Sequence, residues 1–185
     1  MDASSVIDAT RRWIASIVIG LNLCPFAQRV FDADRIRYVV SDAADESGLL
    51  ADLARELEEL IAAPISAIET TLLIHPLALA DFLDYNDFVG AAEQLIANVG
   101  LRGTIQIASF HPKYQFAGTD ADAVENYTNR SPYPMLHLLR EESITAVAED
   151  RKALLEIPRR NMETLKNLGI AKIREKLVAI HGTKT

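Results

Sequence analysis

Residues 68–76, IETTLLIHP, decide the fold of this chain. β-Branched and aliphatic residues dominate the first seven positions, and Pro76 limits the run because proline cannot continue a central strand. We therefore predict a strand from Ile68 to Ile74. A helix is predicted on each side of it, over Leu49 to Ala62 and Leu79 to Val99, because apolar residues recur there at helical spacing.

Two further strands flank these helices. RIRYVVS (Arg35 to Ser41) and TIQIASF (Thr104 to Phe110) are rich in β-branched and aromatic residues. Strands that alternate with helices predict an α/β fold, with a small, mainly parallel sheet of three or more strands flanked by helices. Three strands are few for an open sheet, so an α+β arrangement is the alternative.

Helices are also predicted at both ends of the chain. Residues 3–20 have apolar positions at helical spacing. After Ser143 the pattern predicts helices over 144–155, 159–168 and 170–180, with a break at Pro158. We expect the stretch that contains this break, IPRRNMETLKNLG, to complete the hydrophobic core, although these helices could instead form a homodimer interface.

Length and composition indicate one domain. The chain has 185 residues, of which 49% are hydrophobic, and this suits a single domain over residues 1–185 with 143–185 as its C-terminal helical segment. One cysteine cannot form an internal disulfide. We expect a cytoplasmic protein without membrane contact, because no apolar run could span a bilayer and the first residues lack a basic signal region.

Charge is distributed unevenly along the chain. Residues 1–150 carry 10 Lys and Arg against 23 Asp and Glu, whereas residues 151–185 carry 9 against 3. The cations lie on a short helical end and not across a broad face, so a nucleic-acid partner is not expected. The basic helices are expected to dock on the acidic body or to present a solvated face.

The segment from Phe110 to Glu142 contains a concentration of aromatic, polar and turn-forming residues that predicts a functional site. In parallel sheets, ligands bind beyond the carboxyl ends of the strands. His75 and His111 each follow a predicted strand there, and each precedes a proline. Lys113 and Tyr114, just after the third strand, are predicted ligand contacts.

The same segment contains two predicted helix starts. Thr119 begins a sequence that resembles a capping box, and Ser131-Pro132 has the pattern of a second helix that would run on through Leu139. Free amide donors at that second start, with Arg130, Ser131 and Tyr133, could hold a carboxylate or phosphate. The alternative is that Arg130 pairs with a nearby carboxylate and Ser131 only caps the helix. Asn126 and Asn129 could line a polar pocket, although Asx turns explain both equally well.

Cys24 is the predicted nucleophile. Pro25 suits the first position of a short helix through Val30, which would leave the thiol at a helix N-terminus where the dipole favours thiolate. A buried packing role is the alternative, because free cysteine is often buried. If Cys24 is catalytic, His111 is the preferred base.

The histidines do not have the spacing of a metal site. His75, His111 and His137 lack the helical or hairpin spacing of metal ligands, so no metal site is predicted and His137 is expected to be structural. No particular cofactor is indicated.

Three blocks of this chain resemble the signature of a bacterial family of about 180 residues that is known as a domain of unknown function. The blocks are LNLCPFA, FHPKYQFAGTDADAVENYTNRSPYPMLHLLREES and IPRRNMETLKNLG. The resemblance covers nearly the whole chain and implies a bacterial, cytoplasmic protein of one domain. It implies no activity, cofactor or catalytic residue.

Two functional hypotheses follow from the residues. The first is an enzyme for acyl transfer or hydrolysis of a small anionic substrate, with Cys24 as nucleophile and His111 as base. The second is a non-catalytic binding or regulatory protein for a small anionic ligand, with its pocket in residues 110–142.

Overall fold

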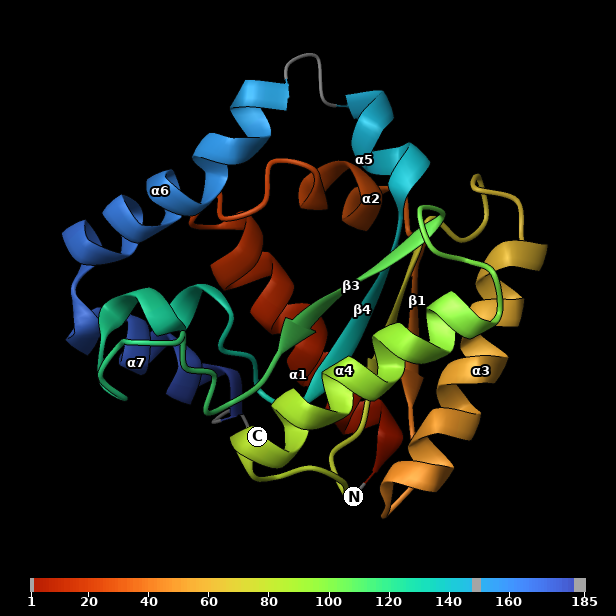
Figure 1. Cartoon of the computed structure of the whole chain (residues 1–185). Helices are drawn as coiled ribbons and strands as arrows, with labels where there is room; N and C mark the ends of the chain where they lie inside the picture. Colours follow the sequence, from red (N-terminus) through yellow and green to blue (C-terminus); the bar gives the residue numbers. More distant parts are fainter. Residues whose placement is uncertain (1, 148–150, 182–185) are drawn as a thin grey trace.

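The computed structural model describes residues 2–147 and 151–181, whose strands form one four-stranded sheet (Figure 1). The strands are β1 (Ile36–Val40), β2 (Thr70–Ile74), β3 (Ile105–Phe110) and β4 (Met135–Arg140). The helices are α1 (Ala3–Trp13), η1 (Ile14–Ile19), α2 (Ala27–Asp32), α3 (Glu46–Ala62), α4 (Phe82–Asn98), η2 (Val124–Thr128), α5 (Glu141–Val147), α6 (Arg151–Leu168) and α7 (Ile170–His181). The three predicted strands are confirmed, each slightly shorter than expected.

The strands lie in the order β1-β2-β4-β3. β1 and β2 are parallel, whereas β4 is antiparallel to both of its neighbours, β2 and β3. Helices cover both faces, so the α/β prediction is confirmed. The prediction of a mainly parallel sheet is wrong, because β4 enters the middle of the sheet in the opposite direction.

β4 occupies residues that were predicted to be a helix starting at Ser131-Pro132, and that prediction is wrong. Ser131 and Tyr133 each precede a proline, and a residue before proline favours extended backbone. The run MLHLLR then places side chains alternately on both covered faces of the sheet, which suits a central strand. Tertiary context therefore overrides the helix propensity of its leucines.

α3 and α4 cover one face of the sheet (Figure 1). Their buried side chains form a hydrophobic cluster with Leu73 of β2, Ile105 of β3 and two leucines of β4. The helical members include Leu49, Leu53, Leu57, Leu60, Tyr85, Phe88, Ala92 and Ile96. Each helix begins at an aspartate whose carboxylate accepts hydrogen bonds from backbone N–H groups of the first turn. This aspartate is Asp45 for α3 and Asp81 for α4.

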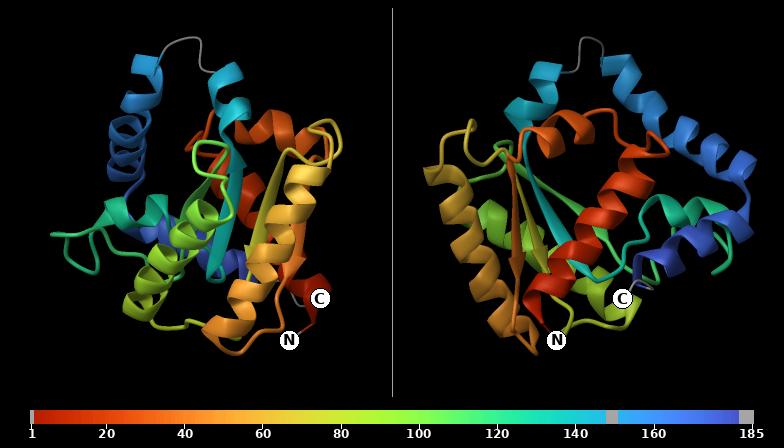
Figure 2. Two further views of the ribbon diagram at one scale, coloured as in Figure 1. Left: turned by 45° about the vertical axis from the view of Figure 1, so that its right-hand side comes forward. Right: turned by 180° about the vertical axis from the view of Figure 1, so that it is seen from behind.

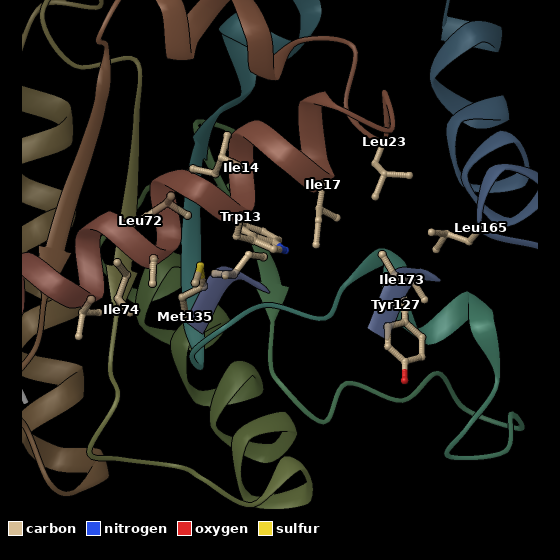
Figure 3. Close-up of a cluster of buried hydrophobic side chains, with 13 residues drawn as sticks. Trp13, Ile14, Ile17, Leu23, Leu72, Ile74, Tyr127, Met135, Leu165 and Ile173 are labelled. Atoms are coloured by element: carbon tan, nitrogen blue, oxygen red, sulfur yellow. The ribbon is translucent and has the colours of Figure 1, made fainter. Parts of the chain in front are cut away.

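α1 and η1 cover the opposite face, as the view from behind shows (Figure 2). Trp13, Ile14 and Ile17 pack there with Leu72 and Met135 of the sheet (Figure 3). The C-terminal helices add Leu165, Ile173 and Ile180 to the same cluster. The prediction that these helices complete the core is therefore confirmed.

Helix α1 continues into a π-helix, η1. The N–H of Gly20 donates to Ala15 O at 3.0 Å, and that of Leu23 donates to Val18 O at 2.8 Å, each five residues earlier. π-Helical turns are rare and occur frequently at functional sites. This wide turn leads directly into the loop that carries Cys24.

Two predicted helix limits are wrong. The helix expected to open at Thr119 is replaced by turns, and a short 3₁₀-helix, η2, follows at Val124–Thr128. The expected break at Pro158 is absent, because α6 runs through it. Proline costs a helix one hydrogen bond and introduces a steric clash, but α6 continues past Pro158 and packs against η2. Among the described residues, no helix is both long and apolar enough to cross a membrane.

The buried hydroxyl of Tyr85 offers a test of how α4 holds the sheet. It donates to Met135 O at 2.8 Å and accepts from Phe110 N–H at 3.0 Å, so it bridges β4 and β3 at their ends. We predict that Tyr85→Phe lowers the free energy of unfolding by about 2 kcal/mol, because the buried Met135 carbonyl and the part-buried Phe110 N–H lose their partner. Urea unfolding monitored by circular dichroism measures this change.

Tyr38→Phe is the matched control, because within the described part of the chain the half-buried Tyr38 hydroxyl has no hydrogen-bond partner. We expect a change below about 0.5 kcal/mol for it. Equal effects of the two substitutions would contradict the bridging role of Tyr85.

Candidate functional site

A cavity of about 300 Å³, here called the sheet-face cavity, lies between the sheet, η1, α2 and α5. Its floor includes Leu72 of β2, His137 of β4 and Ala108 of β3. The strand register places these three residues side by side across the sheet. The floor therefore belongs to the face that α1 covers and not to the face under α4.

Most of the cavity wall is apolar. The helical side contributes Trp13, Ile14, Val18, Phe26, Ala27 and Val30, and further apolar residues come from the sheet and α5. Trp13 is buried, and its ring meets that of Phe110 edge-on, with 5.2 Å between the ring centres. Its Nε1 donates a hydrogen bond to Arg130 O at 3.0 Å. These contacts fix the indole, so the wall is rigid at this point.

Cys24 lies on the wall, in the loop between η1 and α2. Burial raises the pKa of its thiol, and the backbone N–H groups of Phe26 and Ala27 oppose this increase without cancelling it. The predicted short helix exists, but it begins at Ala27, two residues later than expected. At neutral pH Cys24 is therefore a thiol and not a thiolate.

His137 shares this cavity with Cys24. The Thr70 hydroxyl donates to Leu138 O at 2.5 Å, so His137 Nε2, 2.7 Å from Thr70 Oγ1, must carry the proton and donate to it. Burial lowers the pKa of His137 to about 4. The imidazole is therefore neutral at pH 7, and its Nδ1 is an acceptor without a partner among the residues that the structure describes.

A charged cluster stands at the edge of the cavity. The carboxylate of Glu69 is 3% exposed and pairs with both Arg29 and Arg35. Arg29 and Gln106 line the cavity and are also exposed, so they mark its entrance. Ser143 lines the cavity as well, and its Oγ is buried without a hydrogen-bond partner in the described ranges.

The structure does not bring the predicted pair, Cys24 and His111, together. Phe110 faces the sheet-face cavity, and the next residue, His111, points to α4, where its ring lies 5.0 Å from that of Tyr85. Lys113 N–H donates to His111 Nδ1 at 3.0 Å, so Nε2 carries the proton and donates to Leu79 O at 3.1 Å. Burial lowers the pKa of His111.

His75 belongs to the same aromatic cluster at the carboxyl ends of β2 and β3. Its ring stacks on Tyr85 at 5.7 Å, and its Nδ1 lies 3.2 Å from Ala78 O. Nε2 is buried and has no partner within residues 2–147 and 151–181. Burial lowers the pKa of His75 to about 4.

The predicted anion corner is occupied by internal contacts. Arg130 donates to Tyr114 O at 3.2 Å and to Ala121 O at 2.6 Å, and its guanidinium lies 4.3 Å from the centre of the Tyr127 ring. The Ser131 hydroxyl donates to the Tyr133 carbonyl at 2.6 Å. These bonds favour the structural reading of Arg130 and Ser131, while their ligand-binding role stays a prediction.

The remaining predicted contacts lie in the loop from 111 to 134. Asn126 is buried, and its Oδ1 accepts from Phe116 N–H at 3.0 Å, so this side chain organises the turn. Asn129 donates to Ser109 O at 3.1 Å. The Tyr114 ring lies 5.1 Å from that of Phe82, and Lys113 is exposed. None of these residues lines the sheet-face cavity, although Asn129 lines a second cavity beside α6.

Sequence reasoning missed most of the cavity. Trp13, Thr70 and Ala108 were not candidates, and His137 was assigned to a structural role within a helix. The available signal was alternation, because Gln106, Ala108 and Phe110 share one face of β3. Without knowledge of β4, no pattern indicated that His137 joins that face.

Within the described residues, no three His, Cys, Asp or Glu side chains gather so as to hold a metal ion. The fold and cavity define an α/β protein with an apolar cavity on one face of a mixed sheet. The chain belongs to the family described as "Protein of unknown function (DUF1415)", whose model matches residues 5–175. This confirms the resemblance of the three sequence blocks. No curated protein and no solved structure matches the chain.

The two buried, neutral histidines predict a pH-dependent stability. His75 and His137 have pKa values of about 4 in the folded protein, against about 6.5 in an unfolded chain. The unfolded state therefore binds more protons below pH 6.5, and the free energy of unfolding falls as the pH drops from about 6.5 to about 4. Each histidine contributes up to about 3 kcal/mol to this loss, which urea unfolding over a pH series measures.

His137→Leu isolates one of the two contributions. Thr70 keeps its bond to Leu138 O in this variant, so folding at pH 7 should be retained. We expect a shallower loss of stability between pH 6.5 and 4 than in the wild type. An unchanged slope would show that His137 is not the titrating group.

Proposed function

We propose that the protein binds a small amphipathic molecule in the sheet-face cavity, with the apolar body of the ligand against Trp13 and Leu72. One observation carries this proposal: the cavity of about 300 Å³ has mostly apolar walls and a few polar side chains. Binding sites for small molecules have this size and composition. The π-helical turn beside the cavity supports the same conclusion.

The charge at the entrance supports an anionic head group. Two guanidinium groups, those of Arg29 and Arg35, share the single carboxylate of Glu69, which leaves a net positive charge there. Arg29 is exposed and lines the cavity, so it can reach a carboxylate or phosphate without breaking the Arg35 pair. Both hypotheses drawn from the sequence involved a small anionic molecule, and the candidate site is now this cavity rather than residues 110–142 alone.

A second candidate is the thiol-dependent enzyme for acyl transfer or hydrolysis of an anionic substrate. The position of Cys24 on the cavity wall favours it, because a bound substrate would lie beside the thiol. His111 as its base has less support, since both ring nitrogens are hydrogen-bonded and the ring points to α4. His137 is the imidazole that borders the cavity with Cys24.

Binding is the leading proposal because the thiol lacks activation. A cysteine nucleophile needs a lowered pKa or an adjacent base, whereas burial raises the pKa of Cys24. The two candidates predict different reactivity of the same side chain.

Trp13 provides the test of binding, because it is the single tryptophan of the chain and lines the cavity. We predict a saturable change in its fluorescence on titration with octanoate. Ala108→Leu should raise the dissociation constant at least about tenfold, because the larger side chain fills the floor of the cavity. Arg29→Gln should weaken octanoate about threefold or more and leave 1-octanol unaffected.

Ala91→Leu on the exposed side of α4 is the matched control and should bind octanoate like the wild type. Saturable binding that Ala108→Leu leaves unchanged would remove the sheet-face cavity as the site. Absence of any fluorescence change up to millimolar octanoate and octanol would contradict the proposal itself.

Alkylation of Cys24 distinguishes the two candidates. We predict that iodoacetamide at pH 7.5 modifies Cys24 in the native protein at least about tenfold more slowly than in the urea-unfolded chain, because the half-buried thiol has a raised pKa and stays protonated. Intact-mass spectrometry over time measures both rates. Native alkylation faster than that of the unfolded chain would favour the thiol-dependent enzyme.

A further inference from the structure

A second cavity, of about 360 Å³, lies where α6 meets the segment around η2 and is called the α6 cavity here. Phe116 from the loop and Ile157, Pro158 and Met162 from α6 give it apolar walls. It shares no lining residue with the sheet-face cavity. The two cavities are therefore separate candidate sites.

Asn161 lines this cavity and has a buried polar atom. The residue is 8% exposed, and its Nδ2 donates to Leu23 O at 2.7 Å, which fixes the orientation of the amide. Its Oδ1, at the other end of the amide, has no hydrogen-bond partner among the described residues. A buried acceptor without a partner is costly, so Oδ1 would gain from a donor.

Glu125 contributes a negative charge. It is half-buried, lines the α6 cavity, and its carboxylate has no hydrogen bond or ion pair in the described part of the chain. The guanidinium groups of this region are engaged elsewhere: Arg130 on the Tyr127 ring, Arg174 on Asp122, Arg159 on Glu156 and Glu163, and Arg160 on the Asn22 carbonyl. As far as the described residues go, the carboxylate is therefore available to a cation from solution.

The two threonine hydroxyls that line the cavity do not donate hydrogen bonds into it. Thr128 Oγ1 lies 2.9 Å from both Glu125 O and Asn129 Oδ1, and Thr119 Oγ1 lies at hydrogen-bond distance from Phe116 O and Asn126 Oδ1. With their protons engaged, these hydroxyls can only accept. The cavity thus offers a carboxylate and acceptor oxygens beside an apolar wall.

We propose that the α6 cavity binds a small organic cation, a protonated primary amine on a short apolar body. Its ammonium group pairs with Glu125, and its apolar body contacts Phe116 and Met162. An ammonium has donors and no acceptor, which matches the acceptor-rich lining. An anionic ligand of the sheet-face cavity does not fit here.

Benzylamine and benzyl alcohol are the probes, because they share a shape and differ in charge. We expect isothermal titration of the full chain with benzylamine at pH 7.5 to give saturable binding at least about tenfold tighter than that of benzyl alcohol. In ¹H–¹⁵N spectra, the amide signals that shift should come from residues 116–129 and 157–162. These two measurements need no variant.

Glu125→Gln removes the charge and keeps the shape. We expect it to weaken benzylamine binding about tenfold or more and to leave benzyl alcohol unchanged. Glu93→Gln, at an exposed position of α4, is the matched control and should bind benzylamine like the wild type. Equal affinity for the two probes, shifts outside the α6 cavity, or full benzylamine binding by a folded Glu125→Gln variant would each overturn the proposal. Octanoate binding to the same variant separates this result from the fate of the sheet-face cavity.

Discussion

The structure depends on the hydrogen bonds along both edges of β4. β2 and β3 do not touch each other, so β4 is the strand that joins the β1–β2 pair to β3. Its side chains reach both hydrophobic clusters, Met135 on the side of α1, and Leu136 and Leu138 on the side of α4. A single strand thus ties the two edges of the sheet and both helical layers together, and this explains why it is buried despite carrying His137 and Arg140.

The two faces of the sheet differ in how completely side chains fill the space above them. Under α3 and α4, large side chains such as Phe88 and Tyr85 are fully buried and fill the space. On the other face, the small side chains of Ala108, Thr70 and Ala27 lie where the short helix α2 approaches the sheet, and the sheet-face cavity occupies this place. The loop of residues 20–26 borders that cavity through Cys24, and Asn161 of α6 holds its Leu23 carbonyl. Both proposed sites therefore depend on how this one loop is held.

Periodicity in the sequence was enough to predict the helices and strands whose local pattern agrees with their place in the fold. α3 and α4 have one apolar stripe each, and β1, β2 and β3 are rich in β-branched residues, so local preference and tertiary position coincide. β4 was not predictable in this way, because MLHLLR suits a helix as well as a strand buried on both faces. Cys24 was found from its residue type and its neighbours, whereas His137 and Thr70 became candidates only when the strand order placed them in the same cavity. The role of His111 was predicted from its position at a strand end, but the face to which it points depends on the alternation along β3.

The strand order also has a consequence for how the chain folds during synthesis. β1 and β2 can pair as soon as both have left the ribosome, but β3 has no strand partner until residues 135–140 follow it. During that interval both edges of β3 and one edge of β2 present unpaired backbone groups, which are templates for association with other chains. The last strand to be made closes the sheet, so the nascent protein passes through an aggregation-prone stage that ends only when β4 inserts.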